Sequence, residues 1–238
     1  NQSAVVGSDV LWASGVTARY FVPTNASIED TWYGEIFDDS SWSTALTGIG
    51  YDESPDYGSE FGLGGDLGND LNGENETLYV RIPFQVTDAS ALDVLTLRMK
   101  YDDGFVAYLN GERIALANAP DTLSYNAGAA GQNPDDNAVN FEDFDISRFL
   151  NFLTDGSNVL AIHGLNDGLG SSDMLILPEI HGGVTRFIPG VYGVSYRWNE
   201  AGTEATLAGA GGVEFDLDIT VDGNVRSQTW SVPSRAAC

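Results

Sequence analysis

Basic residues are scarce in this sequence. Ten Lys and Arg stand against 35 Asp and Glu, which gives a formal net charge of −25, and Lys100 is the only lysine. A chain of this charge repels phosphate backbones and anionic lipid surfaces, so nucleic acid and membrane surfaces are excluded as partners. The balance predicts a secreted, extracellular or cell-surface protein in salty or calcium-containing surroundings, where counterions screen the self-repulsion.

Cysteine and long apolar runs are also missing. The single cysteine is the last residue, Cys238, so no disulfide can form within the chain. No run of about 18 apolar residues is present, and we therefore expect no membrane insertion. The sequence starts at Asn1 without a methionine or a signal-like segment, which suggests a processed protein or an excised domain.

Apolar residues alternate with polar ones along most of the chain, which predicts an all-β protein. Asn110–Gly111 and Asp222–Gly223 each join two such runs and predict tight hairpins. The longest stretches without alternation are 50–76 and 121–137, and loops of that length often carry function. The strands expected in the first part of the chain are Ala18–Val22, Leu78–Val86, Ala91–Tyr101, Phe105–Leu109, Glu112–Ala117, Asn140–Ile146, Ser157–Leu165 and Met174–Ile180.

Several stretches between Trp32 and Ile180 resemble the galactose-binding-like jelly rolls found in secreted bacterial proteins as carbohydrate-binding modules. They include GEIFDDSSWSTALTGIGY, LYVRIPFQV, LTLRMKYDDGFVAYLNGERIA and the segment from FEDFDISRF to LILPEI. The resemblance implies a jelly-roll β-sandwich over residues 1–182. Residues 183–238 lie outside it and are expected to form a β-hairpin extension that packs on the sandwich or on a neighbouring subunit.

Two places are candidates for ligand binding. Asp102 and Asp103 precede Gly104 at the end of a predicted strand; they can form a plain tight turn, or they can converge on a cation or on sugar hydroxyls. Tyr51, Tyr57 and Tyr125 fall in the long loops, where their rings can pin the loops or stack on sugar rings.

Calcium is the cofactor that the acidic loops favour, because it takes six to eight oxygen ligands on a flexible backbone. No EF-hand spacing is present, and solvated acidic loops or a capped turn near Trp42 are the alternatives. The candidate metal ligands are Asp38, Asp39, Asp66, Asp70, Asn166 and Asp173.

Three functions remain open at this stage. The first is a non-catalytic extracellular carbohydrate-binding or adhesion module with a structural calcium, whose partner is a glycan. The second is a structural subunit of a filament or surface layer, whose partners are copies of itself and which assembles through edge strands. The third is a polysaccharide hydrolase or lyase. It ranks last because the sequence carries no nucleophile elbow, P-loop or zinc motif.

Overall fold

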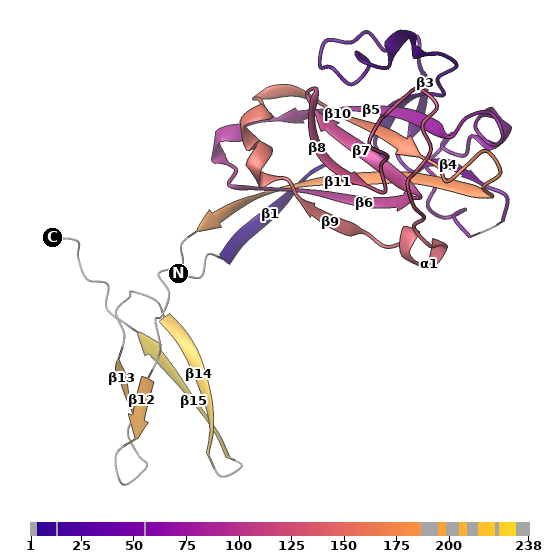
Figure 1. Ribbon diagram of the computed structural model, residues 1–238. Coiled ribbons are helices and arrows are strands. Elements are labelled where there is room, and N and C mark those ends of the chain that lie inside the picture. The colour runs from indigo at the N-terminus through magenta and orange to yellow at the C-terminus, as the bar shows by residue number, and fades with distance from the viewer. Residues whose placement is uncertain are drawn as a thin grey trace. The chain divides into compact units, whose positions relative to one another are not determined.

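The computed structural model describes residues 4–12, 14–54, 56–186, 195–198, 205–208, 214–221 and 224–231. These residues divide into two compact units, Val5–Thr185 and a second unit of Asn1–Ala4 with Arg186–Cys238. The larger unit is a sandwich of two β-sheets (Figure 1). The expected all-β sandwich is therefore confirmed. No helix in the described residues is long and apolar enough to cross a membrane.

The first sheet has five strands. Four of them follow the order β1-β11-β6-β9, and the fifth, β4, pairs with the first residues of β11. The pairings of β11 with β4 and β6, and of β6 with β9, are antiparallel. Sequence alternation did not single out β1 and β4. The strands are β1 (Ala4–Trp12), β4 (Ile49–Asp52), β6 (Val94–Asp102), β9 (Glu142–Asp145) and β11 (Asp173–Arg186).

The second sheet has six strands in the order β3-β2-β5-β10-β7-β8, all antiparallel. Its strands are β2 (Thr17–Phe21), β3 (Ser43–Leu46), β5 (Thr77–Val86), β7 (Gly104–Leu109), β8 (Glu112–Ala117) and β10 (Gly156–Leu165). The helices of this unit are short: η1 (Ala26–Ile28), η2 (Gly68–Asp70), η3 (Ala89–Ala91), α1 (Asp135–Ala138) and η4 (Ser147–Phe152).

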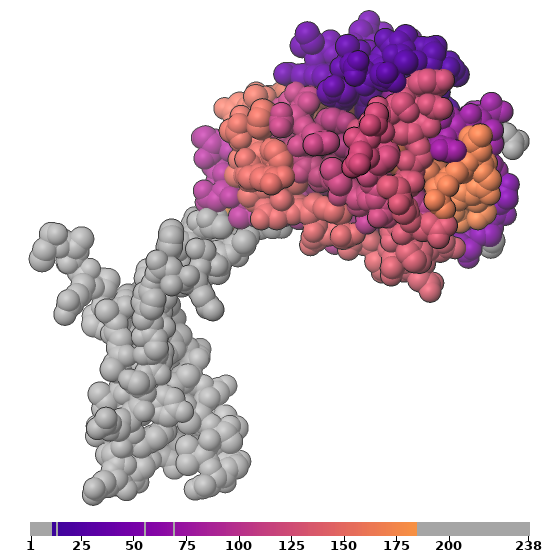
Figure 2. Space-filling model, in the orientation of Figure 1, coloured from indigo at the N-terminus to yellow at the C-terminus, as the bar shows by residue number. Residues whose placement is uncertain are grey.

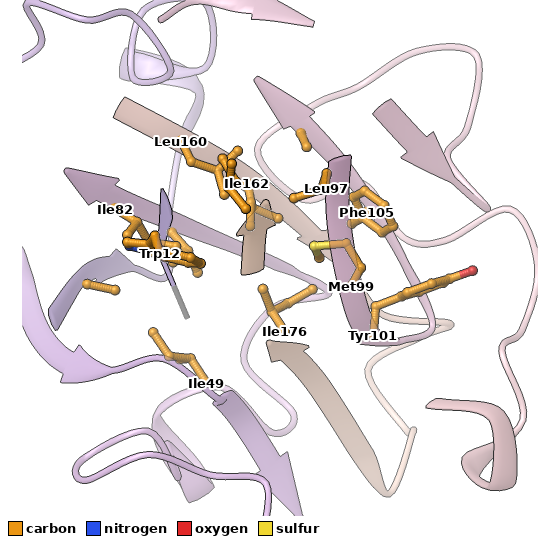
Figure 3. Packing of buried hydrophobic residues seen from close by; sticks show 14 of the residues in the cluster. Trp12, Ile49, Ile82, Leu97, Met99, Tyr101, Phe105, Leu160, Ile162 and Ile176 are labelled. Atoms are coloured by element: carbon orange, nitrogen blue, oxygen red, sulfur yellow. The ribbon is translucent and has the colours of Figure 1, made fainter. Parts of the chain in front are cut away.

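The core between the sheets follows the alternation. In β6, Leu95, Leu97 and Met99 are buried, while the residues between them are partly exposed. They face the inward side chains of the other sheet, among them Ile82 and Ile162 (Figure 3). Burial of each such side chain contributes about 1.5–3 kcal/mol.

The central strands of the six-stranded sheet, β5, β10 and β7, are mostly buried on both faces. All six residues of β7 are buried, because Phe105 points into the main core and Val106 into a second, aromatic cluster. In that cluster the Trp32 ring stacks on Tyr79 with ring centroids 4.1 Å apart. The segment between β2 and β3 thus covers the outer face of this sheet and is seen as the indigo layer in Figure 2.

Arg81 of β5 fixes this covering segment. Its side chain is buried, and its Nε donates to Asp39 over 2.7 Å. Its Nη1 donates to the carbonyls of Trp32 and Gly34, and its Nη2 donates to the carbonyl of Phe37. One guanidinium therefore donates to three backbone carbonyls and one carboxylate of the covering segment.

His163 of β10 lies in the same aromatic cluster, with Nε2 3.0 Å from the Thr77 hydroxyl oxygen. Burial lowers its pKa to about 3, so the imidazole stays neutral. The unfolded chain takes up a proton near pH 6.5, which the folded chain does not. The neutral ring of His163 therefore makes its full contribution to the stability of the folded state above that pH. This contribution is lost as the pH falls toward the pKa of His163 in the folded protein.

We expect this loss to have a slope of about 1.4 kcal/mol per pH unit below pH 6.5. Denaturant unfolding of the wild type and of His163→Gln between pH 7 and pH 5 measures it. The stability difference between the two proteins should shrink as pH falls. Parallel profiles would show that His163 is protonated in the folded protein.

The Asn110–Gly111 hairpin is confirmed. It joins β7 to β8 with positive φ at both residues, 50° and 96°, as a type I′ turn requires. Within the second unit, β12 (Ser195–Trp198) pairs with β13 (Ala205–Ala208), and β14 (Glu214–Val221) pairs with β15 (Asn224–Ser231), both antiparallel. Asp222–Gly223, Asn1 and Cys238 lie outside the described residues.

Candidate functional site

The two long loops, residues 50–76 and 121–137, meet at one end of the sandwich. There β10 ends at Leu165, beside the first residues of β5 and β7, and β6 ends at Asp102. β11 begins nearby at Asp173, which pairs with the last residue of β4. The β8–β9 connection and the β10–β11 connection complete this end.

Three carboxylates converge here. Asp102, Asp135 and Asp173 each offer an oxygen, and these oxygens lie within 4.8 Å of one another. Asp102 and Asp173 are 2% and 7% exposed, whereas Asp135 is exposed on α1. Strand ends and a loop helix that are distant in sequence therefore build one acidic centre, called here the Asp102 centre.

Asp102 is not satisfied by the protein alone. Its Oδ2 accepts a hydrogen bond from the hydroxyl of Tyr57, but its Oδ1 is buried with no hydrogen-bond partner. Burial, together with the charges of Asp103, Asp173 and Asp135, raises the pKa of Asp102 to about 8. Burial also raises the pKa of Asp173. Among the described residues, no ion pair involves any member of the centre.

These residues fit a hard divalent cation. Calcium binds oxygens at about 2.3–2.6 Å, so ligands across the ion lie up to about 5 Å apart, which matches the spacing here. An all-carboxylate set suits calcium rather than zinc, which prefers nitrogen and sulfur. A bound cation would give Asp102 Oδ1 its missing partner, and water could complete the shell beside exposed Asp135.

Residues near the Asp102 centre fix the loops through hydrogen bonds. Asp103 accepts from the backbone amides of Asn133 (3.1 Å) and Asp167 (2.8 Å). Asn166 donates to the hydroxyl of Tyr51 (2.9 Å), which donates to the Ser171 carbonyl (3.0 Å). Asp103 and Asn166 therefore tie the two connections to the strand ends, beside the acidic centre.

The sequence-based interpretation that Tyr51 and Tyr57 stack on sugar rings is wrong. Both side chains are buried, at 2% and 0% exposure, in different hydrophobic clusters. A ring without a free face cannot stack on a sugar, so these two tyrosines support the site through their hydroxyls. Tyr125 is the one tyrosine of the three that lines a cavity described below.

The structure does not bring the other predicted metal ligands to the Asp102 centre. Hydrogen bonding with the Ser40 side chain and then with the Ser40 amide lowers the pKa of Asp38. Asp39 pairs with Arg19 (3.2 Å) and Arg81 (2.7 Å), so its charge is already neutralised by protein. Asp66 accepts from the Gly68 amide, and Asp70 lines the cavity.

Asp135 is the member of the centre that sequence reasoning missed. Its signal was its place in the second long loop, next to Asp136. Neither the turn pattern nor strand alternation indicates which of these two acids reaches Asp102.

A cavity of about 400 Å³ lies at the same end, next to the start of β5. Both connections link the two places: the β8–β9 connection carries Tyr125 and Asp135, and the β10–β11 connection carries Leu169 and ends directly before Asp173. The residues lining the cavity are Val22, Pro23, Thr24, Asp70, Glu74, Asn75, Glu76, Tyr125, Asn126 and Leu169.

The fold is thus a β-sandwich with a cluster of three carboxylates at its loop end. No protein-family model matches the chain, and no curated protein matches it.

Solved structures show only distant likeness. An uncultured Clostridium β-glucuronidase aligns at a TM-score of 0.47 and 10% identity, covering 95% of this chain and 45% of its own. A Bacteroides uniformis β-glucuronidase aligns at a TM-score of 0.46 and 14% identity, covering 96% of this chain and 26% of its own. A Bacteroides cellulosilyticus glycosyl hydrolase family 2 member aligns at a TM-score of 0.45 and 10% identity, covering 96% of this chain and 30% of its own. The chain spans less than half the length of these proteins, and likeness at this level assigns no function.

Proposed function

We propose that the chain is a non-catalytic, extracellular carbohydrate-binding or adhesion module of the galactose-binding-like type, stabilised by calcium. The observation that carries the calcium assignment is the Asp102 centre, with its buried, unpartnered carboxylate oxygen. The cavity beside it and the sequence resemblance support carbohydrate as the ligand.

Calcium at this site would hold together the ends of β6 and β11 and the loop bearing α1. Three carboxylates, one of them exposed, make an open site of the kind that extracellular modules use, with dissociation constants of about 10⁻⁴–10⁻³ M. Such a site is filled outside cells, where the strongly acidic composition also suits the chain.

A non-catalytic role agrees with the chemistry of the described residues. The neutral His163 is buried against the rings of Trp32 and Tyr79, and it belongs to neither the centre nor the lining of the cavity. Among the residues that line the cavity, none is a histidine, lysine or arginine. A lyase needs a positive group beside its substrate to stabilise a developing carboxylate charge, and the described residues that line the cavity supply no basic side chain for this.

A glycan array probed in calcium and again in EDTA tests the proposal. We expect binding to a neutral or amine-bearing glycan in calcium, weakened by EDTA because the connections loosen. A polysaccharide panel should show no turnover. Absence of binding at millimolar sugar in both buffers would refute the carbohydrate assignment, and turnover that is abolished by one carboxylate substitution would refute the non-catalytic one.

A further inference from the structure

The cavity is built from four separate segments. They are the residues after β2, the turn before β5, the loop around Tyr125 and the β10–β11 connection with Leu169. The buried Asn75 side chain connects three of them, because Asn75 lies in the turn before β5 and donates to the carbonyls of Pro23 and Tyr125. A hollow of about 400 Å³ held by such bonds is in the range of ligand pockets, about 300–1,000 Å³.

The lining combines apolar and acidic groups. Tyr125, Val22 and the half-exposed Leu169 supply apolar surface. Asp70, Glu74 and Glu76 supply carboxylates, and within the described part of the chain no hydrogen bond or ion pair reaches these three side chains. A ligand that matches this lining has an apolar ring face and a positive charge.

We propose that this cavity is a saccharide subsite for an amine-bearing sugar of the glucosamine class. The proposal rests on the carbohydrate-binding function above and specifies its ligand. The ammonium group donates to the carboxylates of Glu74 and Glu76, and the C–H face of the ring packs on Tyr125 and Leu169. A uronate would bring its own carboxylate next to those of Glu74 and Glu76, and the repulsion between these like charges excludes it from the cavity.

The subsite is separate from the Asp102 centre, since the two share no residue. Calcium therefore does not contact the sugar in this proposal. In the described structure, Asp70, Glu74 and Glu76 do not form a cluster of metal-ligand spacing. The group that neutralises the carboxylates of the cavity is therefore the sugar amine rather than a metal ion.

The test is calorimetric titration of the full chain with three disaccharides in calcium: a glucosamine disaccharide, its N-acetylated form and a galacturonate disaccharide. Charge-assisted hydrogen bonds predict at least about tenfold tighter binding of the amine than of the acetylated form. No binding is expected for the uronate. Glu74→Gln/Glu76→Gln and Tyr125→Ala should each weaken amine binding about tenfold or more.

The control is Glu112→Gln/Asp121→Asn, which removes two exposed acids outside the cavity and should leave affinity unchanged. Equal weakening by both double variants would overturn the proposal, because it indicates general attraction to an acidic protein. Equal affinity for amine and acetylated sugars would overturn the subsite's charge preference, yet leave the carbohydrate function standing. That function itself fails only if no glycan of the array binds.

Discussion

Calcium added to chelator-treated protein is expected to raise the unfolding temperature by about 5–10 °C. At a calcium concentration 100 times the dissociation constant, binding to the folded state alone contributes about 2.7 kcal/mol. For a domain of 150–250 residues, each kcal/mol moves the midpoint by roughly 2–4 °C. Since the expected dissociation constant is about 0.1 mM or weaker, a titration to 10 mM calcium followed by calorimetry or fluorescence measures the shift.

Asp135 and Asp136 offer a matched pair of variants. Both are exposed first-turn residues of α1, but only Asp135 belongs to the Asp102 centre. Asp135→Asn should remove most of the calcium-induced shift, whereas Asp136→Asn should keep it. Asp102→Asn should abolish it. Equal shifts in the Asp135 and Asp136 variants, or no shift in the wild type, would disprove calcium binding at this centre.

Arg81→Ala is expected to cost about 3–5 kcal/mol of the free energy of unfolding. Removing one partner of a buried ion pair has this effect, because the remaining groups lose their compensation. Here the loss leaves Asp39 with only Arg19 and removes the side-chain donor of the Trp32 and Phe37 carbonyls. Denaturant unfolding measures the change, and near-ultraviolet circular dichroism should report a loosened Trp32.

Arg19→Ala is the control, since Arg19 pairs with the same Asp39 over 3.2 Å but is 35% exposed. This pair is more exposed than the Arg81–Asp39 pair, and Arg19 also donates to the carbonyls of Asp39 and Ser40, so the variant should lose only about 1 kcal/mol. Comparable losses in the two variants would mean that Arg81 does not fix the covering segment.

Much of the fold was predictable from the sequence. Period-two alternation placed β5, β7, β8 and β10 within one or two residues, since each strand has one face in the main core. The strands β1, β3 and β4 were missed. Strands β3 and β4 are four residues long, and too few residues alternate in them to form a pattern.

The candidate site was only partly predictable. Asp102 and Asp173 were recognised because they end and begin strands, where a turn gathers polar groups. Asp135 could not be placed, because its approach depends on how a long connection folds back. Tyr51 and Tyr57 show the opposite problem: loop residues look exposed in a sequence, but a loop that packs on the sandwich buries its own aromatic rings.

Residues of the chain itself cover the outer face of the central strands of the six-stranded sheet, so the proposed function leaves recognition to the connections at one end. Under that proposal, stability and specificity depend on different residues: the strands and Arg81 support the fold, and Tyr125, Glu74 and Leu169 select the ligand. Such a division makes the protein a scaffold for laboratory evolution. A library that varies the cavity residues would search new ligands without altering a strand of the core.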